Sequence, residues 1–250
     1  GEEMRVVLDS PLEVGKQVTC KVNWDKRYDF MQQHTCQHLL SAVVHDLHKA
    51  ETVKWELGRT SVAVDFDFSC DFSAEQVTEI ERTMNEHIRA ARGVSWSVFG
   101  REELATLPLL RGAPKGVAAE FEHLRVITIE GLDSNPCGGT HLNSTAEIQL
   151  FKVIAVERDR GAARLRFICG DRVMRTLSSS LARESELGVL LSVPPSEQCS
   201  AVDNLLKDKR DTTKKNKAMM DELAALYGQS LLTQWTETCP RAPYIARHRP

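Results

Sequence analysis

The chain has 250 residues, 42% of them hydrophobic and 27% charged, with a formal net charge of -3 at pH 7. This composition predicts a soluble globular domain with some extension, and the small net charge means that a nucleic acid would need a local basic patch. No apolar run approaches the ~20 residues of a membrane span, and the N-terminus lacks a signal-peptide layout, so we expect a cytoplasmic protein without a membrane partner.

In chain order, two short β-type runs at residues 6–8 and 18–22 predict strands. Asp29 with Gln32 indicates a capping box for a helix that runs to about Lys49. At ~100° per residue, one side of this helix carries an apolar stripe of Cys36, Leu40, Val43 and Leu47. The opposite side carries His34, His38, Ser41, His45 and His48.

A hairpin is predicted from two runs that are rich in β-branched and aromatic residues, 53–57 and 61–68. A capping box of Ser73 and Gln76 begins a helix that we expect to reach about Arg92. Further strands are expected over residues 94–99, 124–129, 147–157 and 164–169, with a helical turn at 102–107 and a loop at 108–119. This mixture predicts an α+β fold, an antiparallel sheet packed with helices.

The C-terminal part of the chain has a helical pattern from Asp171 onwards. Two prolines interrupt it at residues 193–195, and it resumes over residues 196–235. We therefore expect a helical arm over residues 171–235 instead of a second globular core. Residues 236–250 show no periodicity and are predicted to be a loose tail.

Two pairs of residues in distant parts of the chain suggest a metal site. His34 and His38 are one helical turn apart and stack on one face of the predicted helix, while Cys137 and His141 share a tight, glycine-bearing turn. Imidazole nitrogens and a thiolate are the donors that zinc prefers, so the four side chains offer one tetrahedral zinc site.

Several simpler interpretations compete with parts of this site. A lone His-x-x-x-His motif is weak, because most helix histidines bind no metal. His45 and His48 lie roughly 16 Å or more from His34 along the helix, too far to share its ion. The residue after His34 is Thr35, where a His-Glu-x-x-His protease carries its glutamate base, and a protease is therefore disfavoured. The chain contains seven scattered cysteines, an odd number that favours reduced thiols over disulfides.

The motif at residues 34–40, taken with the segment at 133–141, resembles the editing domain of alanyl-tRNA synthetase and its free-standing relatives, the AlaX-type alanyl-tRNA editing proteins. Threonyl-tRNA synthetases share a related domain. The resemblance covers roughly residues 10–170, and the Pro-Cys-Gly-Gly-Thr-His run at 136–141 is its specific part. No aminoacylation core precedes the motif in this chain, which favours the free-standing form.

The resemblance also implies a domain organisation. Residues 22–27 resemble the end of a small β domain, so residues 1–26 are expected to close that domain. Residues 27–170 then form the zinc-containing editing domain, and the helical arm follows. The activity implied is hydrolysis of the ester that joins a wrong amino acid, chiefly serine and sometimes glycine, to the tRNA for alanine, while the correct alanyl ester is spared.

Candidate roles follow for residues near the expected ligands. One zinc ion would polarise the ester carbonyl, lower the pKa of a water or hold the substrate amine, or serve only the structure. Gly138 and Gly139 offer backbone N–H groups to an oxyanion, unless they serve only turn geometry. The hydroxyl that distinguishes serine from alanine could be recognised by Thr35, Gln37 and Thr140, although Thr35 could be purely structural. The strand after the first helix could line the pocket with Trp55 and Glu56, unless Trp55 is a core residue.

A basic cluster lies in the C-terminal arm and consists of Lys207, Lys209, Arg210, Lys214, Lys215 and Lys217. It is either a solvated helix face or a contact to the tRNA backbone. The alternative to an editing hydrolase is a zinc-stabilised tRNA-binding module without catalytic activity, and either protein would have mischarged tRNA as its partner.

Overall fold

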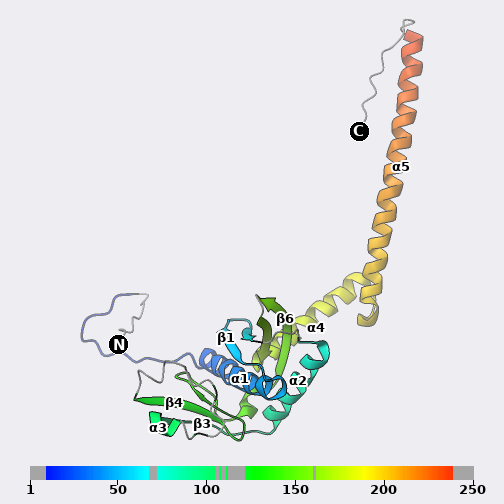
Figure 1. The fold of residues 1–250 in the computed structure, drawn as a ribbon. Helices are drawn as coiled ribbons and strands as arrows, with labels where there is room; N and C mark the ends of the chain where they lie inside the picture. The colour runs from blue at the N-terminus through cyan, green and yellow to red at the C-terminus, as the bar shows by residue number, and fades with distance from the viewer. Residues whose placement is uncertain are drawn as a thin grey trace. The chain divides into compact units, whose positions relative to one another are not determined.

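The computed structural model describes residues 10–67, 72–104, 107, 111, 122–159 and 162–238. The chain separates into two compact units, residues 1–177 and residues 178–250. Within the first unit, helix α1 (Trp24–His48) contacts strands of two different antiparallel sheets (Figure 1). The predicted α+β class is confirmed.

The larger sheet has four strands in the order β1 (Thr52–Leu57), β2 (Val62–Phe66), β7 (Ala162–Cys169) and β6 (Phe151–Asp159). The smaller sheet has three strands in the order β3 (Val94–Gly100), β4 (His123–Ile129) and β5 (Asp133–Pro136). The β1–β2 pair is the predicted hairpin, and β6 and β7, which pair as a second hairpin, correspond to the strands expected at 147–157 and 164–169. The second begins later than expected, because residues Thr145–Ile148 form a 3-10 helix, η2.

Helix α2 (Ala74–Arg89) begins at the predicted capping box, in which Ser73 Oγ accepts a hydrogen bond from the Gln76 backbone and the Gln76 side chain accepts one from the Ser73 backbone. Its buried side chains, Ile80, Met84 and Ile88, recur every four residues and face the core. A short helix, α3 (Arg101–Leu104), forms within the expected helical turn. Most of the loop predicted at 108–119 lies outside the described residues.

The start of α1 differs from the prediction. The helix begins at Trp24, and its cap is Asn23, whose Oδ1 accepts a hydrogen bond from the Lys26 backbone at 3.0 Å. The predicted cap at Asp29 is wrong, because the Asp29 carboxylate pairs with the buried guanidinium of Arg172 at 2.8 Å, just after β7. Sequence proximity suggested a local cap, whereas the carboxylate has a partner more than 140 residues away.

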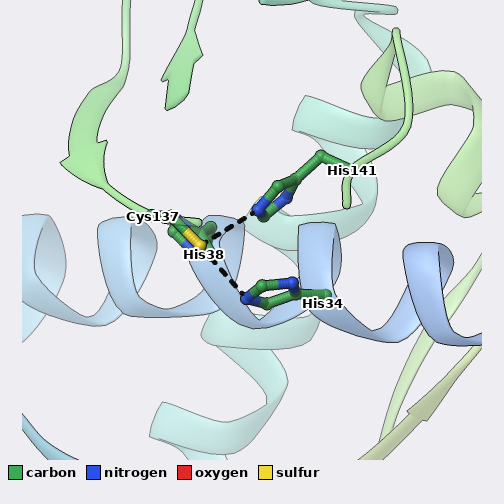
Figure 2. A group of neighbouring side chains, drawn as sticks. All are labelled: His34, His38, Cys137 and His141. Carbon is green, nitrogen blue, oxygen red and sulfur yellow. Dashed lines mark hydrogen bonds between the residues drawn. The ribbon is translucent and has the colours of Figure 1, made fainter. Parts of the chain in front are cut away.

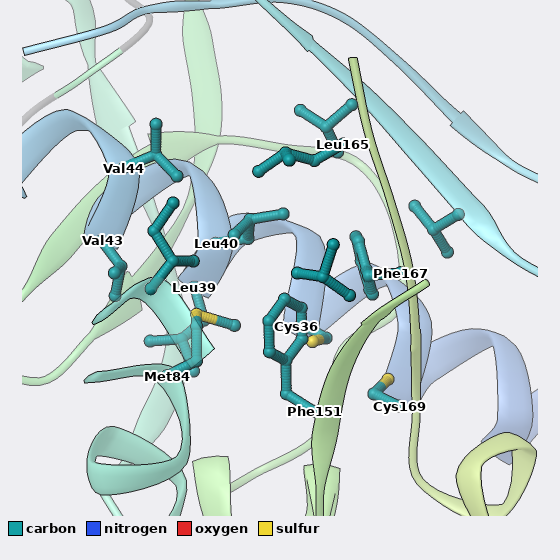
Figure 3. Packing of buried hydrophobic residues seen from close by; sticks show 14 of the residues in the cluster. Cys36, Leu39, Leu40, Val43, Val44, Met84, Phe151, Leu165, Phe167 and Cys169 are labelled. Atoms are coloured by element: carbon teal, nitrogen blue, oxygen red, sulfur yellow. The ribbon is translucent and has the colours of Figure 1, made fainter. Parts of the chain in front are cut away.

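The middle of α1 is buried on every side, from Gln32 to Val44. Its histidines point towards the loop that carries Cys137 (Figure 2), so the predicted polar face does not meet solvent in this part of the helix. Its apolar stripe packs against β6, β7 and α2 through side chains that include Phe151, Phe167 and Met84 (Figure 3). Each such large side chain contributes about 1.5–3 kcal/mol by leaving water, so α1 is anchored chiefly by this stripe.

Two further expectations need correction. Residues 18–22 form no strand, and Val18 and Val22 are exposed, while residues 6–8 lie outside the described part of the chain. Strand β5 was not predicted, because Asp-Ser-Asn-Pro has low β propensity. It forms because its backbone pairs with β4, with Pro136 opposite Val126 at one end and Asp133 opposite Ile129 at the other. This pairing places Cys137 directly at the end of a strand.

Helix α4 (Asp171–Leu191) ends just before the two predicted breaker prolines, and a single 3-10 turn, η3 (Pro195–Glu197), leads into α5 (Gln198–Thr238). In the second unit, the Gln198 side chain donates a hydrogen bond of 2.7 Å to the Glu184 carbonyl and ties the two helices together. The helical arm is confirmed and extends to Thr238, whereas the predicted loose tail beyond it lies outside the described residues. None of the described helices is both long and apolar enough to cross a membrane.

Candidate metal centre

The structure brings together the four side chains that the sequence predicts as metal ligands. His34 and His38 come from α1, Cys137 follows β5, and His141 lies four residues further on (Figure 2). Their donor atoms all lie within 4.8 Å of one another, and Cys137 Sγ is 3.5 Å from His34 Nε2 and 3.4 Å from His141 Nε2. Three imidazoles and one thiol around a common point can hold a metal ion.

Burial sets the protonation of these groups. It lowers the pKa of His34, and with neighbouring imidazole and guanidinium charges it lowers the pKa of His38 to about 3 and that of His141 to about 2. It also raises the pKa of the Cys137 thiol. The histidines are therefore neutral at pH 7, as metal ligands must be, while the thiol must lose its proton when a metal binds.

These shifts predict that the metal-free protein loses stability in mild acid. Between pH 6.5 and about 5 the unfolded chain protonates its histidines while His38 and His141 stay neutral in the folded state. The unfolded state then binds more protons than the folded state. The free energy of unfolding therefore decreases as the pH is lowered, by up to about 1.4 kcal/mol per pH unit for each histidine. Urea titrations of the metal-free protein at pH 7, 6 and 5 measure this slope. It should be smaller in His38→Gln, and an equal slope in that variant would contradict the assignment.

Arg125, on β4, holds the loop that carries the ligands. Its Nη1 donates hydrogen bonds to the carbonyls of Cys137 at 2.8 Å and Gly139 at 2.7 Å, and its own carbonyl accepts one from the Cys137 N–H at 3.0 Å. Its guanidinium also lies over the Trp96 ring, 5.4 Å from the centroid. Sequence reasoning missed Arg125, because no motif or spacing links it to residues 137–139.

Thr35 lies in the interior, with 0% of its surface exposed. Its Oγ1 accepts a hydrogen bond from the Leu142 backbone at 3.0 Å and lies 3.3 Å from His141 Nδ1. These contacts orient the His141 ring so that Nε2 faces the cluster, as second-layer partners of metal ligands commonly do. The structural alternative for Thr35 therefore fits better than hydroxyl recognition.

The two glycines of the loop have different surroundings. A Cβ on Gly139 would lie 2.3 Å from His34 Cε1 and 2.6 Å from His34 Nδ1, whereas a Cβ on Gly138 would meet no described atom within 4 Å. The Gly139 N–H also donates to Cys137 Sγ at 3.4 Å, so this contact occupies one of the two amides considered as oxyanion donors. The close approach of the His34 ring therefore accounts for a glycine at position 139 better than turn geometry does.

We expect Gly139→Ala to displace the His34 ring and to weaken metal binding by about 10-fold or more, the scale of losses seen when a ligand loses its orientation. Gly138→Ala is the matched control, since it adds the same methyl group to open space. Competition with a chromophoric chelator measures both affinities. Equal affinities in the two variants would show that the close approach has no role.

A cavity of about 230 Å³ opens beside the cluster and is lined by His38 and Cys137 together with polar side chains, among them Gln37, Ser41 and Thr52. Ser41 Oγ accepts hydrogen bonds from Gln37 Nε2 at 3.0 Å and from Thr52 Oγ1 at 2.7 Å. Gln37 is 4% exposed, and its Oε1 has no hydrogen-bond partner among the described residues. A residue of the cavity wall thus carries a buried, unpaired acceptor next to the candidate metal centre.

Arg111 closes one side of this cavity. Its Nη1 donates to the Ser41 carbonyl at 2.9 Å, and its Nε donates to Asp133 Oδ1 at 2.8 Å. Asp133 is 1% exposed, and burial raises the pKa of its carboxyl group although the Arg111 charge opposes the rise. Sequence reasoning assigned a role to neither residue: Arg111 lies in the predicted loop at 108–119, and Asp133 begins the segment at 133–141 without being a predicted ligand.

The remaining candidates are placed as follows. Trp55 lines the cavity, and its ring centroid is 5.5 Å from that of His34, whereas Glu56 is not among the described lining residues because neighbouring strand residues face opposite ways. Glu51 lines the cavity instead, and it pairs with His45 at 3.3 Å. Thr140 is exposed on the other side of the loop, away from the Gln37 cavity lining.

Four of the six basic candidates on α5 share one face. All six are exposed, and the 3-4-3 spacing of Lys207, Arg210, Lys214 and Lys217 places these four within roughly 80° of one another around the helix. We call them the basic face of α5. Several exposed apolar residues of α5, among them Leu205, Leu223 and Tyr227, lie on the other side of the helix.

Comparison with known proteins gives similarities at the level of both domain and chain. Residues 124–168 match the family described as the threonyl and alanyl tRNA synthetase second additional domain. The chain is 32% identical over 242 residues to alanyl-tRNA editing protein Aarsd1-B of Xenopus laevis, which covers 96% of this chain and 57% of that protein. It is 35% identical over 225 residues to alanyl-tRNA editing protein Aarsd1 of Mus musculus, covering 89% and 54%.

A further similarity is to an alanine-tRNA ligase of Lactococcus lactis, with 29% identity over 225 residues that cover 86% of this chain and 25% of the ligase. The chain spans about half the length of the editing proteins that it matches.

Proposed function

The chain is related to the alanyl-tRNA editing proteins and to the editing domain of alanyl-tRNA synthetase, and from this premise we propose that it is an aminoacyl-tRNA deacylase. It hydrolyses the ester that joins a wrong amino acid, chiefly serine and also glycine, to the tRNA for alanine, and it spares alanyl-tRNA. The observation that carries the proposal is a four-donor cluster opening onto a small polar cavity.

We infer that the ion of this cluster is a single zinc. One thiolate and three imidazoles match zinc's preference for sulfur and nitrogen donors at tetrahedral positions. When bound, zinc supplies Lewis acidity towards an ester carbonyl or a water molecule. His34, His38, Cys137 and His141 would hold the ion, while Thr35 and Arg125 keep His141 and the loop in position.

The cavity beside the cluster suits the amino-acid part of the substrate. Its buried acceptor, Gln37 Oε1, can receive a hydrogen bond from the serine hydroxyl, and Ser41 and Thr52 hold the amide in place. Alanine would fill the same space but leave this acceptor unpaired, which costs about 1–3 kcal/mol. The exposed Glu51 carboxylate at the same cavity can attract the substrate ammonium group.

A deacylation assay tests the proposal directly. Zinc-loaded protein is incubated with tRNA(Ala) charged with serine, glycine or alanine, and with a second tRNA charged with serine. We expect rapid loss of the seryl ester from tRNA(Ala), and slower or no loss of the alanyl ester. If every ester stays intact while the tRNA binds, the chain is instead a zinc-stabilised tRNA-binding module.

The basic face of α5 is proposed to contact the tRNA backbone. Changing Lys207, Arg210, Lys214 and Lys217 to glutamine should weaken tRNA binding. The slope of the logarithm of the binding constant against the logarithm of the salt concentration should become shallower by about 0.7 for each phosphate that the variant no longer neutralises. Filter binding at several salt concentrations measures both quantities. The double variant of Lys209 and Lys215, which lie off this face, is the control, and unchanged affinity and slope in the fourfold variant would leave a merely solvated helix face.

A further inference from the structure

A second cavity, of about 270 Å³, reaches the metal-binding cluster from another direction. The cavity that we assign to the amino acid touches the cluster through His38 and Cys137, whereas the second cavity touches it through His141. The two cavities share no lining residue in the described part of the chain. The cluster and its loop therefore lie between two separate binding spaces.

The second cavity is lined by exposed aromatic surface. Trp24, at the start of α1, and Trp96, on β3, both line it, and each is 62% exposed. The flat faces of exposed indoles are surfaces on which unpaired nucleobases stack. The guanidinium of Arg125, held over Trp96, adds a positive charge to this wall.

A positively charged hollow continues from this cavity. It shares Arg27 and Thr140 with the second cavity, and its lining adds Lys26 and Phe30. Among the described residues, no carboxylate lines the second cavity or this hollow, whereas Glu51 lines the amino-acid cavity. The aromatic side chains suit the base of a nucleotide, and the cations of the adjoining hollow, Arg27 and Lys26, suit its phosphate.

We propose that the second cavity binds the terminal adenosine of the tRNA acceptor end, with its base held by both Trp96 and Trp24 and its 5′ phosphate near Arg27 and Lys26. The inference rests on the proposed function, because the scissile ester connects the amino acid directly to the ribose of this nucleotide. If the amino acid occupies one cavity and the ester lies at the cluster, the adenosine must leave on another side, and the second cavity is lined with the chemistry that it requires.

Binding of uncharged RNA tests this assignment without any hydrolysis. Two fluorescently labelled acceptor-stem hairpins, one ending in CCA and one in CC, are titrated by anisotropy with the zinc-loaded full chain. We expect the CCA end to bind at least about fivefold more tightly, the lower end of what stacking contributes per base. Trp96→Ala and Trp24→Ala should bring this ratio close to one, while Trp96→Phe should retain it.

Tyr227→Ala is the control, because Tyr227 is a 66% exposed aromatic residue that lies on α5 opposite the basic face and lines neither cavity. Metal content is measured for each variant, and if Trp96→Ala loses metal through Arg125, Trp24→Ala decides. A wild-type ratio in both alanine variants would overturn the adenosine site even if seryl-tRNA is hydrolysed. Conversely, the alanine variants could lose the preference for the CCA hairpin while the wild-type chain hydrolyses no ester. That result would support the adenosine site and overturn the proposed function.

Discussion

His38→Ala is expected to abolish zinc retention and, with it, deacylation of seryl-tRNA. His38 supplies one of only four donors, is 6% exposed, and also lines the amino-acid cavity. Loss of a mere orienting partner lowers metal affinity by about 10- to 100-fold, so loss of a ligand should lower it by more than about 100-fold. The measurements are zinc per chain after gel filtration and the single-turnover rate on seryl-tRNA(Ala).

The control for this variant is His45→Ala. His45 lies on the same helix, is half-buried and contacts Glu51, but it contributes no donor to the cluster. It should keep one zinc per chain. Stoichiometric zinc in the His38→Ala protein would contradict the assigned centre, whether or not that protein hydrolyses the ester.

Each of the two pairs in the four-donor cluster could be predicted because the information within a pair is local. The four-residue spacing of His34 and His38 fixes their common face on any helix, and Cys137 and His141 lie in one short turn. The hairpins and the α2 capping box were predictable for the same reason, since strand alternation and caps depend on neighbours in sequence.

Contacts between distant segments could not be predicted in this way. Strand β5 forms against its own propensity because β4 offers a partner, and Arg125 meets the loop only after that pairing is made. The burial of the histidine side of α1 depends on the loop that covers it. Asp29 followed the pattern of a local cap, yet its partner Arg172 comes from the far end of the first unit.

The same limit applies to the roles of Thr35 and Gln37. Both are close to ligands in sequence, and both were candidates for recognising a hydroxyl group. The structure separates them, because Thr35 contacts His141 and Leu142 in the interior. Gln37 instead belongs to the cavity wall, and its buried side-chain oxygen is unpaired among the described residues. Of the two, only Gln37 therefore remains a candidate for distinguishing serine from alanine.

Gln37→Leu is expected to lower the preference for seryl-tRNA over alanyl-tRNA by about 10- to 100-fold. Leucine keeps the approximate volume but removes the acceptor, so the serine hydroxyl loses its partner and alanine no longer leaves one unpaired. Hydrolysis of glycyl-tRNA should change much less, because glycine has no side chain to recognise. The values of kcat/KM for the three esters on tRNA(Ala) give the result.

Gln33→Leu is the matched control, since Gln33 is equally buried on α1 but bonds the Cys169 carbonyl at 3.1 Å and lies outside the described cavity lining. It introduces the same change in the same helix, so any general loss of stability or zinc appears in both variants. If Gln37→Leu holds its zinc and keeps the wild-type ratio of seryl to alanyl hydrolysis, the cavity beside His38 does not read the hydroxyl through Gln37. The discrimination would then have to come from the rest of the cavity wall, where Ser41, Thr52, Arg111 and Asn135 are among the remaining polar side chains.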